Sequence, residues 1–214
     1  MIKAVILDMD GVLVDSEPFI CEAAMKMFEE RGLNVCAEDF VPFVGAGEDR
    51  YIGGVAEKYG YALDIERDKA RTYELYGQIV RGRLEPLPGV SDFISKARGL
   101  GLKLAVASSA DRVKVDTNLR ELGLAADTFD TVVSGLDVSR KKPDPEIFLT
   151  AASRLGVEPA ACLVVEDAVN GVAAAKAAGM RCLGITTSFT PDELSAADWT
   201  APDLASAPED VLRW

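Results

Sequence analysis

The sequence predicts an α/β protein: a doubly wound parallel sheet with a small α-helical cap domain inserted after the first strand. Three observations lead to this prediction. Short, wholly apolar runs recur along the chain, segments with helical periodicity separate most of them, and one long segment contains no such run. Strands that alternate with helices form a parallel sheet, because each helix returns the chain to the same edge. We expect the core to comprise residues 1–15 and 86–214, and the cap residues 16–85.

Five apolar runs are the expected strands of the sheet. Helices cover both faces of a parallel sheet, so its strands are apolar throughout instead of alternating with polar residues. The runs span residues 4–7, 102–107, 131–133, 163–165 and 182–185.

Helical patterns lie between these runs. Three of the patterns end at a glycine, a common residue at helix C-termini: Gly123, Gly156 and Gly179. Another pattern begins with Asp144 as a possible cap and Pro145 at the first helical position. The expected core helices span residues 90–98, 113–122, 145–155 and 168–178.

The expected cap has helical periodicity and no convincing buried strand. Apolar pairs recur at helical spacing from Phe19 to Phe28, and further helices fit residues 49–59 and 65–83. A single connection in an α/β unit usually spans about 2–6 residues, so this segment is too long to be a loop. We therefore expect a second, helical domain, with Pro88-Gly89 marking the return to the core.

Composition and charge exclude several classes of function. The 214 residues are 49% hydrophobic, which is enough for a full core, and the net charge is −12. An acidic surface repels nucleic acids and anionic membrane faces, so we expect neither as a partner. The only apolar run near the N-terminus, residues 4–7, is too short for a signal peptide or a membrane span.

Histidine and cysteine usage narrows the chemistry further. The chain has no histidine, which removes Ser-His-Asp and Cys-His catalysis. Its four cysteines include no CxxC pair, so disulfide scaffolds and zinc sites are not expected. Reduced thiols are typical of the cytoplasm, and we expect a cytoplasmic protein, with a monomer as the default state.

The first expected strand leads directly into Asp8-Met9-Asp10-Gly11. Ligands of open parallel sheets bind outside the carboxyl ends of the strands, and Gly11 permits a sharp turn there. Two carboxylates at one strand end repel each other unless a cation such as Mg²⁺ lies between them. One aspartate could then attack phosphorus while the other transfers the proton. Alternatively, both aspartates only cap a turn.

Three further polar groups follow expected strands or precede a helix. Ser108-Ser109 ends the second strand and could bind phosphate oxygens, or only cap the next helix. Lys142 lies in a proline-containing loop and could neutralise phosphate and Asp8, or only be solvated. Glu166-Asp167 ends another strand and could complete a metal site, or only begin a helix. In a parallel sheet these ends converge on one crevice, which favours the catalytic interpretation.

The combination resembles the haloacid dehalogenase superfamily, in its branch with a helical cap after the first strand. The resemblance covers essentially the whole chain and includes the β-phosphoglucomutase-like proteins and the phosphatase-like domain of plant suppressor-of-quenching proteins. The matching stretches are Asp8 to Glu17, Ala107-Ser108-Ser109, Lys142 to Phe148, Val165 to Gly171 with Ala178-Gly179-Met180, and Gly45-Ala46-Gly47-Glu48 in the cap.

The resemblance implies a Rossmann-like core, Mg²⁺ as cofactor and an aspartyl-phosphate intermediate. It implies that Asp8 is the nucleophile and Asp10 the acid/base, which separates the phosphotransferases from true dehalogenases. It further implies metal binding by Asp8, the Asp10 backbone carbonyl and Asp167, with Glu166 adjacent. The residues expected to bind phosphate in the core are Gly11, Ser108, Ser109 and Lys142.

The cap departs from the pattern of sugar-phosphate mutases. Such mutases carry a histidine shortly after the first motif, where this chain has Phe19 and Ile20, and basic cap residues that hold a second phosphate. Here Glu48 stands where an arginine is expected, and its carboxylate would repel a bisphosphate. Arg50 is close in sequence and is a second candidate for substrate binding. Charged residues of this kind are usually solvated.

We therefore expect a Mg²⁺-dependent phosphatase acting on a small phosphomonoester, such as a sugar phosphate or similar metabolite. A β-phosphoglucomutase-type mutase and a non-catalytic regulatory module are the alternatives. The missing histidine and Glu48 count against the mutase. The complete set of acids, hydroxyl and lysine counts against the regulatory module.

Overall fold

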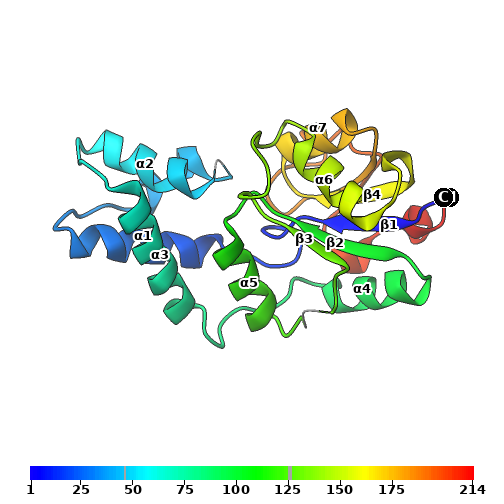
Figure 1. Cartoon of the computed structure of the whole chain (residues 1–214), viewed down its shortest axis with the longest axis horizontal. Coiled ribbons are helices and arrows are strands. Elements are labelled where there is room, and N and C mark those ends of the chain that lie inside the picture. Colours follow the sequence, from blue (N-terminus) through cyan, green and yellow to red (C-terminus); the bar gives the residue numbers. More distant parts are fainter. Residues whose placement is uncertain (46, 125–126) are drawn as a thin grey trace.

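The computed structural model describes residues 1–45, 47–124 and 127–214. Figure 1 shows two parts side by side: a helical part made of α1, α2 and α3, and an α/β part that contains the sheet. Within the described residues, no helix is both long enough and apolar enough to cross a membrane.

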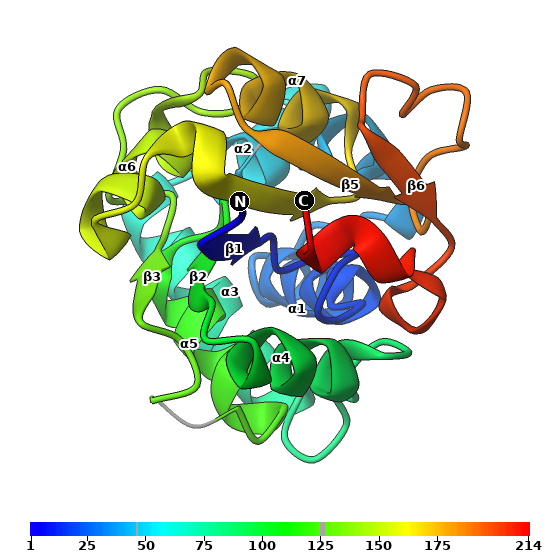
Figure 2. The same cartoon turned by 90° about the vertical axis from the view of Figure 1, so that its right-hand side faces the viewer.

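The sheet has six parallel strands in the order β3-β2-β1-β4-β5-β6. The chain starts in the middle of the sheet and winds outward in both directions, as the view in Figure 2 shows. The predicted doubly wound fold is therefore confirmed. The strands are β1 (Ala4–Leu7), β2 (Lys103–Ala107), β3 (Thr131–Val133), β4 (Cys162–Glu166), β5 (Arg181–Ile185) and β6 (Trp199–Ala201).

Helices cover both faces of the sheet, so alternate residues of the central strand enter different cores. Val5 and Leu7 pack with α4 and α5 on one face, while Ala4 and Ile6 pack with α6 and α7 on the other. All four side chains are fully buried, which explains why this strand has no polar positions. The core helices are α4 (Val90–Gly99), α5 (Arg112–Glu121), α6 (Glu146–Leu155) and α7 (Val169–Ala177).

The cap contains an aromatic cluster, which is continuous with the hydrophobic core on the α4 and α5 face of the sheet. The ring of Phe28 lies 6.2 Å from that of Phe40 and 6.3 Å from that of Tyr61, measured between centroids. Edge and tilted contacts of this kind stabilise a small domain beyond simple burial. The cap helices are α1 (Glu17–Glu30), α2 (Glu48–Lys58) and α3 (Ile65–Ile79), with short 3-10 turns at Ala37–Asp39 and Val41–Phe43.

Two chain segments connect cap and core, and they lie side by side. Val14 forms an isolated antiparallel bridge with Pro86, and the backbone N–H of Leu87 donates to the carbonyl of Leu13 at 3.0 Å. This pairing lies beside the expected cap boundaries at residues 15/16 and 85/86.

One core helix, α5, also contacts the cap. Asp111, at the N-cap position of α5, pairs with Lys69 of α3 at 2.9 Å, and the hydroxyl of Tyr76 donates to Asn118. Both contacts join α3 to α5 of the core. The cap is thereby docked against α5 through polar groups.

The structure contains one strand that was not predicted, and several elements begin or end at other residues than expected. Strand β6 was not predicted, because Trp199–Ala201 is short, follows polar residues and gains its ladder only from β5. Helix α3 ends at Ile79 instead of residue 83, since Gly82 adopts a positive φ of 67°. Helix α6 begins at Glu146, whose N–H donates to Asp144 Oδ1 at 3.0 Å.

The central position of β2 leads to a prediction about stability. Leu104 is fully buried in this strand, whereas Leu136 is 66% exposed in a loop. We expect Leu104→Ala to lower the free energy of unfolding by about 2–5 kcal/mol, because it leaves a cavity in a packed core. Leu136→Ala, the control, should change it by less than about 0.5 kcal/mol. Urea unfolding of both variants measures the difference, and equal effects would contradict the packing described.

Candidate active site

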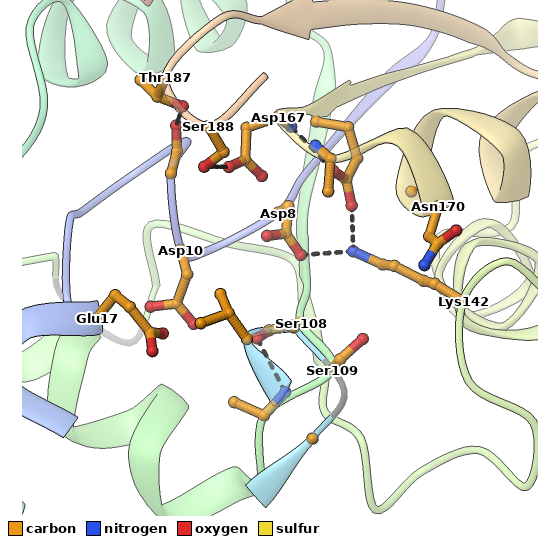
Figure 3. A pocket seen from close by; sticks show the side chains of 18 of the residues that line it. Asp8, Asp10, Glu17, Ser108, Ser109, Lys142, Asp167, Asn170, Thr187 and Ser188 are labelled. Carbon is orange, nitrogen blue, oxygen red and sulfur yellow. Dashed lines mark hydrogen bonds and ion pairs between the residues drawn. The ribbon is translucent and has the colours of Figure 1, made fainter. Parts of the chain in front are cut away.

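A cavity of about 750 Å³ lies between the carboxyl ends of the strands and the cap. Its core side is lined by the residues that sequence analysis expected to converge: Asp8, Asp10, Gly11, Ser108, Ser109, Lys142, Glu166 and Asp167. Its cap side is lined by residues from α1, α2 and the turns between them, including Glu17, Phe43, Glu48 and Tyr51. Figure 3 shows that the labelled core side chains point into one shared space.

Lys142 joins two acids on the core side of the cavity. Its Nζ donates to Asp8 Oδ1 at 2.6 Å and to Glu166 Oε1, and its side chain is only 9% exposed. Burial lowers the pKa of Lys142, but the carboxylates of Asp8 and Glu166 outweigh this effect and raise it. Lys142 is therefore a fixed positive charge beside the expected nucleophile.

Three buried carboxylates meet at the ends of β1 and β4. Asp8, Glu166 and Asp167 each have one carboxylate oxygen in this cluster, and these three oxygens lie within 4.8 Å of one another. Burial, with repulsion from Glu166, raises the pKa of Asp8 and raises that of Asp167 to about 7, while Lys142 opposes both shifts. One ammonium cannot balance three acids, so the cluster calls for further positive charge.

The surroundings of this cluster fit a divalent cation with hard oxygen ligands. Glu166 Oε2 accepts from the N–H groups of Asp167 and Ala168 at 2.9 and 2.8 Å, and Ser188 donates to Asp167 Oδ2. These bonds fix the two carboxylates from outside, as the outer shell of a metal site does. Oδ1 of Asp167 accepts none of them, whereas Glu166 Oε1 accepts from Lys142.

Glycines beside the cluster make room for the carboxylates. A Cβ at Gly171 would lie 1.8 Å from Glu166 Oε1, and a Cβ at Gly11 would lie 2.0 Å from Asp167 Oδ2. Any larger side chain at either position would displace an acid of the cluster. The donor set and its space are thus both compatible with a bound divalent metal.

Asp10 has a different set of partners from Asp8. Its Oδ1 accepts from the hydroxyl of Ser16, and its Oδ2 accepts from Lys114 Nζ at 2.8 Å. The side chain is part of the cavity wall but not of the three-carboxylate cluster. In Figure 3 its carboxylate lies on the Glu17 side of the space.

The serines at the end of β2 complete the core side. Ser108 is 2% exposed, and its Oγ accepts from the N–H of Ala110 at 3.2 Å. Because this oxygen acts as an acceptor, its own O–H remains available to donate to a phosphate oxygen. Asp111, not a serine, is the N-cap residue of α5, so helix capping does not explain Ser108 or Ser109.

The two cap residues expected to contact the substrate, Glu48 and Arg50, differ in where the structure places them. Glu48 is 8% exposed, so the expectation that it is solvated is wrong; helix α2 packs it toward Lys114, 3.8 Å from Glu48 Oε1. Arg50 is half exposed, pairs with Glu57 at 2.8 Å and lies over the ring of Phe43, and it does not line the cavity. Of the cap-loop stretch that carried part of the resemblance, Ala46 lies outside the described residues.

Sequence analysis missed several lining residues. Lys114 is a single lysine inside a helix, and no local pattern separates it from a solvated one; in the structure it is 3% exposed. Thr187 and Ser188 follow β5, so the strand-end rule that identified Ser108 could have found them. Thr187 donates to the carbonyl of Gly11 at 2.6 Å and holds the turn after the first strand.

Comparison with known proteins agrees with this geometry. Residues 2–179 match the family model of the haloacid dehalogenase-like hydrolases. The crystal structure of CbbY from Rhodobacter sphaeroides in complex with phosphate superposes with a TM-score of 0.85 at 26% identity, covering 96% of each chain.

Two curated relatives differ in how much of their length the chain spans. SUPPRESSOR OF QUENCHING 1 of Arabidopsis thaliana is 44% identical over 88% of this chain, but the match covers only 18% of that relative. The phosphorylated carbohydrates phosphatase of Thermotoga maritima is 35% identical, with 87% of each chain covered. The chain belongs to the haloacid dehalogenase-like hydrolases, within their phosphatase branch, and is a phosphoric monoester hydrolase.

Proposed function

We propose that the protein is a Mg²⁺-dependent phosphatase that hydrolyses a small phosphomonoester, such as a sugar phosphate, through an aspartyl phosphate on Asp8. The observation that carries the proposal is the placement of Asp8 beside Lys142, in one cluster with the acids Glu166 and Asp167. A nucleophilic carboxylate next to a phosphate dianion needs such positive charge to overcome repulsion. When bound by Asp8, Asp167 and the Asp10 carbonyl, with Glu166 adjacent, Mg²⁺ would supply charge neutralisation and Lewis acidity.

In the first half of the reaction, Asp8 forms a bond to phosphorus while the ester P–O bond breaks. Lys142 and the hydroxyl of Ser108 hold the phosphate oxygens, and Ser109 and Gly11 line the same space. Asp10, held by Ser16 and Lys114, gives a proton to the departing alkoxide. The organic product leaves on the cap side of the cavity.

In the second half, water attacks the aspartyl phosphate and restores the Asp8 carboxylate. Asp10 takes the proton from this water, which returns the site to its starting state with release of inorganic phosphate. The cap, docked on α5, excludes bulk water during the transfer.

Relatives support the substrate class. One relative is named a phosphorylated carbohydrates phosphatase, and the Rhodobacter sphaeroides protein was crystallised with phosphate. All four cysteines are free thiols, which is compatible with the reducing cytoplasm we infer for a monomeric enzyme.

Hydrolysis is favoured over mutase chemistry because of Glu48. A mutase must hold a bisphosphate in either orientation, and this buried carboxylate faces the side where a second phosphate would lie. Incubation with hexose 1-phosphate distinguishes the two: we expect free phosphate and no hexose 6-phosphate. Interconversion without net phosphate release would favour the mutase.

The two aspartates of the first motif provide the direct test of mechanism. We expect Asp8→Asn to reduce phosphate release from a panel of sugar phosphates to background, because the amide cannot attack phosphorus. Asp10→Asn should lower kcat by about 10²–10⁴-fold through loss of proton transfer. Asp192→Asn, at an exposed position, is the control and should retain activity. Full activity in Asp8→Asn would refute the nucleophile assignment.

The raised pKa values predict how Mg²⁺ binding depends on pH. In the metal-free protein, Asp167 has a pKa of about 7 against an ordinary value of 3.8, and that of Asp8 is also raised. Between pH 3.8 and about pH 7, the folded metal-free protein binds more protons than the unfolded chain. Its free energy of unfolding therefore falls as the pH rises through this range. Mg²⁺ replaces these protons, and its stabilising effect on Tm should therefore be larger at pH 8 than at pH 5.5. An equal or larger effect at pH 5.5 would contradict the assignment.

The space at Gly171 predicts a loss of metal affinity. An alanine Cβ would meet Glu166 Oε1 at 1.8 Å, so Gly171→Ala should displace that carboxylate. We expect Mg²⁺ affinity, measured by calorimetry, to fall by about 10–100-fold. Gly77→Ala is the matched control, because a Cβ there meets nothing within 4 Å. Unchanged affinity in Gly171→Ala would argue against a metal held at Glu166.

A further inference from the structure

The side of the cavity away from Lys142 is acidic. Asp10, Glu17 and Glu48 line it, and Lys114 is the one lysine or arginine that accompanies them among the described lining residues. Lys114 bonds to Asp10 at 2.8 Å and lies 3.8 Å from Glu48. Burial raises the pKa values of Glu17 and Glu48, and Lys114 opposes both shifts. When the three acids are ionised, the single charge of Lys114 does not balance them, and this region of the cavity is then negative.

Glu48 presents an unused hydrogen-bond acceptor in this region. It is the first residue of α2 and more than nine-tenths buried. Its Oε1 faces Lys114, whereas its Oε2 has no hydrogen-bond partner among the described residues. The hydroxyl of Tyr73 lies beside Glu48 but completes no hydrogen bond with a described group. A buried carboxylate oxygen without a bonded donor is unfavourable unless a ligand supplies one.

A second pair of unused groups lies beside it. Tyr51, on the same face of α2 as Glu48, is 5% exposed, and its hydroxyl lies next to Glu17. Neither the Tyr51 hydroxyl nor Glu17 Oε1 completes a hydrogen bond with a described group. Figure 3 shows the Glu17 carboxylate beside Asp10, on the side where the organic part of a substrate would lie.

We propose that Glu48 and Glu17 form a specificity subsite for the organic part of the substrate, which accepts hydroxyl or ammonium donors and rejects a second anion. This inference rests on the proposed phosphatase function of the same cavity. Hydroxyl and ammonium groups can donate to the free carboxylate oxygens, and the bonds from ammonium are the stronger ones. A second phosphate or a carboxylate would face like charges in a water-poor space.

A series of hexose phosphates tests the subsite by binding. We choose glucosamine 6-phosphate, glucose 6-phosphate and 6-phosphogluconate, which carry an ammonium, a hydroxyl and a carboxylate. The first two are pyranoses and the third is an open chain, so the effect of charge is measured by comparing the same three ligands in a charge-neutral variant. Calorimetry with the Asp8→Asn variant and Mg²⁺ at pH 7 measures binding without turnover. We expect 6-phosphogluconate to bind at least about 10-fold more weakly than glucose 6-phosphate, because of like-charge repulsion.

Glu48→Gln, built into the same variant, should reduce this difference to less than about 3-fold, because the amide carries no charge. Glu57→Gln is the control: it removes a charge from the same helix, but Glu57 is exposed, pairs with Arg50 and does not line the cavity. Melting temperatures of both variants show whether they fold. If Glu48→Gln does not, Glu17→Gln provides the same comparison.

The outcomes separate the possibilities. Equal binding of 6-phosphogluconate, no binding of any ester, or an unchanged difference in Glu48→Gln would each overturn the subsite. Tighter binding of glucosamine 6-phosphate than of glucose 6-phosphate would support it and identify an ammonium ligand, whereas equal binding of these two would support a hydroxyl ligand. Phosphate release by the unsubstituted protein tests the phosphatase proposal separately: selective binding without turnover would refute the phosphatase and retain the subsite.

Discussion

The ammonium of Lys142 lies between the carboxylates of Asp8 and Glu166, and much of the structure follows from the need to keep these charges together. Three acids within a few ångströms, removed from water, repel one another and resist ionisation. The lysine offsets part of this repulsion, and the small residue at Gly171 leaves room for Glu166. The remaining imbalance is what makes the cluster suited to a divalent cation and a phosphate group.

The sheet is the device that brings these groups into contact. Its central strand, β1, has β2 on one side and β4 on the other, so Asp8, Ser108 and Asp167 emerge at neighbouring strand ends. Residues far apart in sequence thus meet without long loops. Because the strands are buried on both faces, packing fixes the position of each strand end. The side chains at these ends are therefore held in fixed positions as well.

The difference between groups at strand ends and groups on packed helices explains what the sequence could and could not predict. Asp8 and Asp167 follow apolar runs, and the topology of a parallel sheet is enough to place them together. Lys114 and Glu48 belong to helices of different domains, and their burial depends on how the cap packs against the core, which no local pattern encodes. The edge strand β6 was not predicted for a related reason: its three residues are ordered by pairing with β5 and not by their own apolar character.

Two neighbouring backbone connections separate the core, which holds the proposed catalytic residues, from the cap, which holds the two glutamates of the proposed specificity subsite. Only two backbone segments cross from core to cap, and they run alongside each other at Val14 and Pro86. The cap can therefore vary in sequence, or be exchanged as a whole, with little disturbance to the strand ends that hold Asp8 and Lys142. In this architecture the proposed catalytic groups belong to the sheet, and the two glutamates of the proposed specificity subsite belong to one compact insertion.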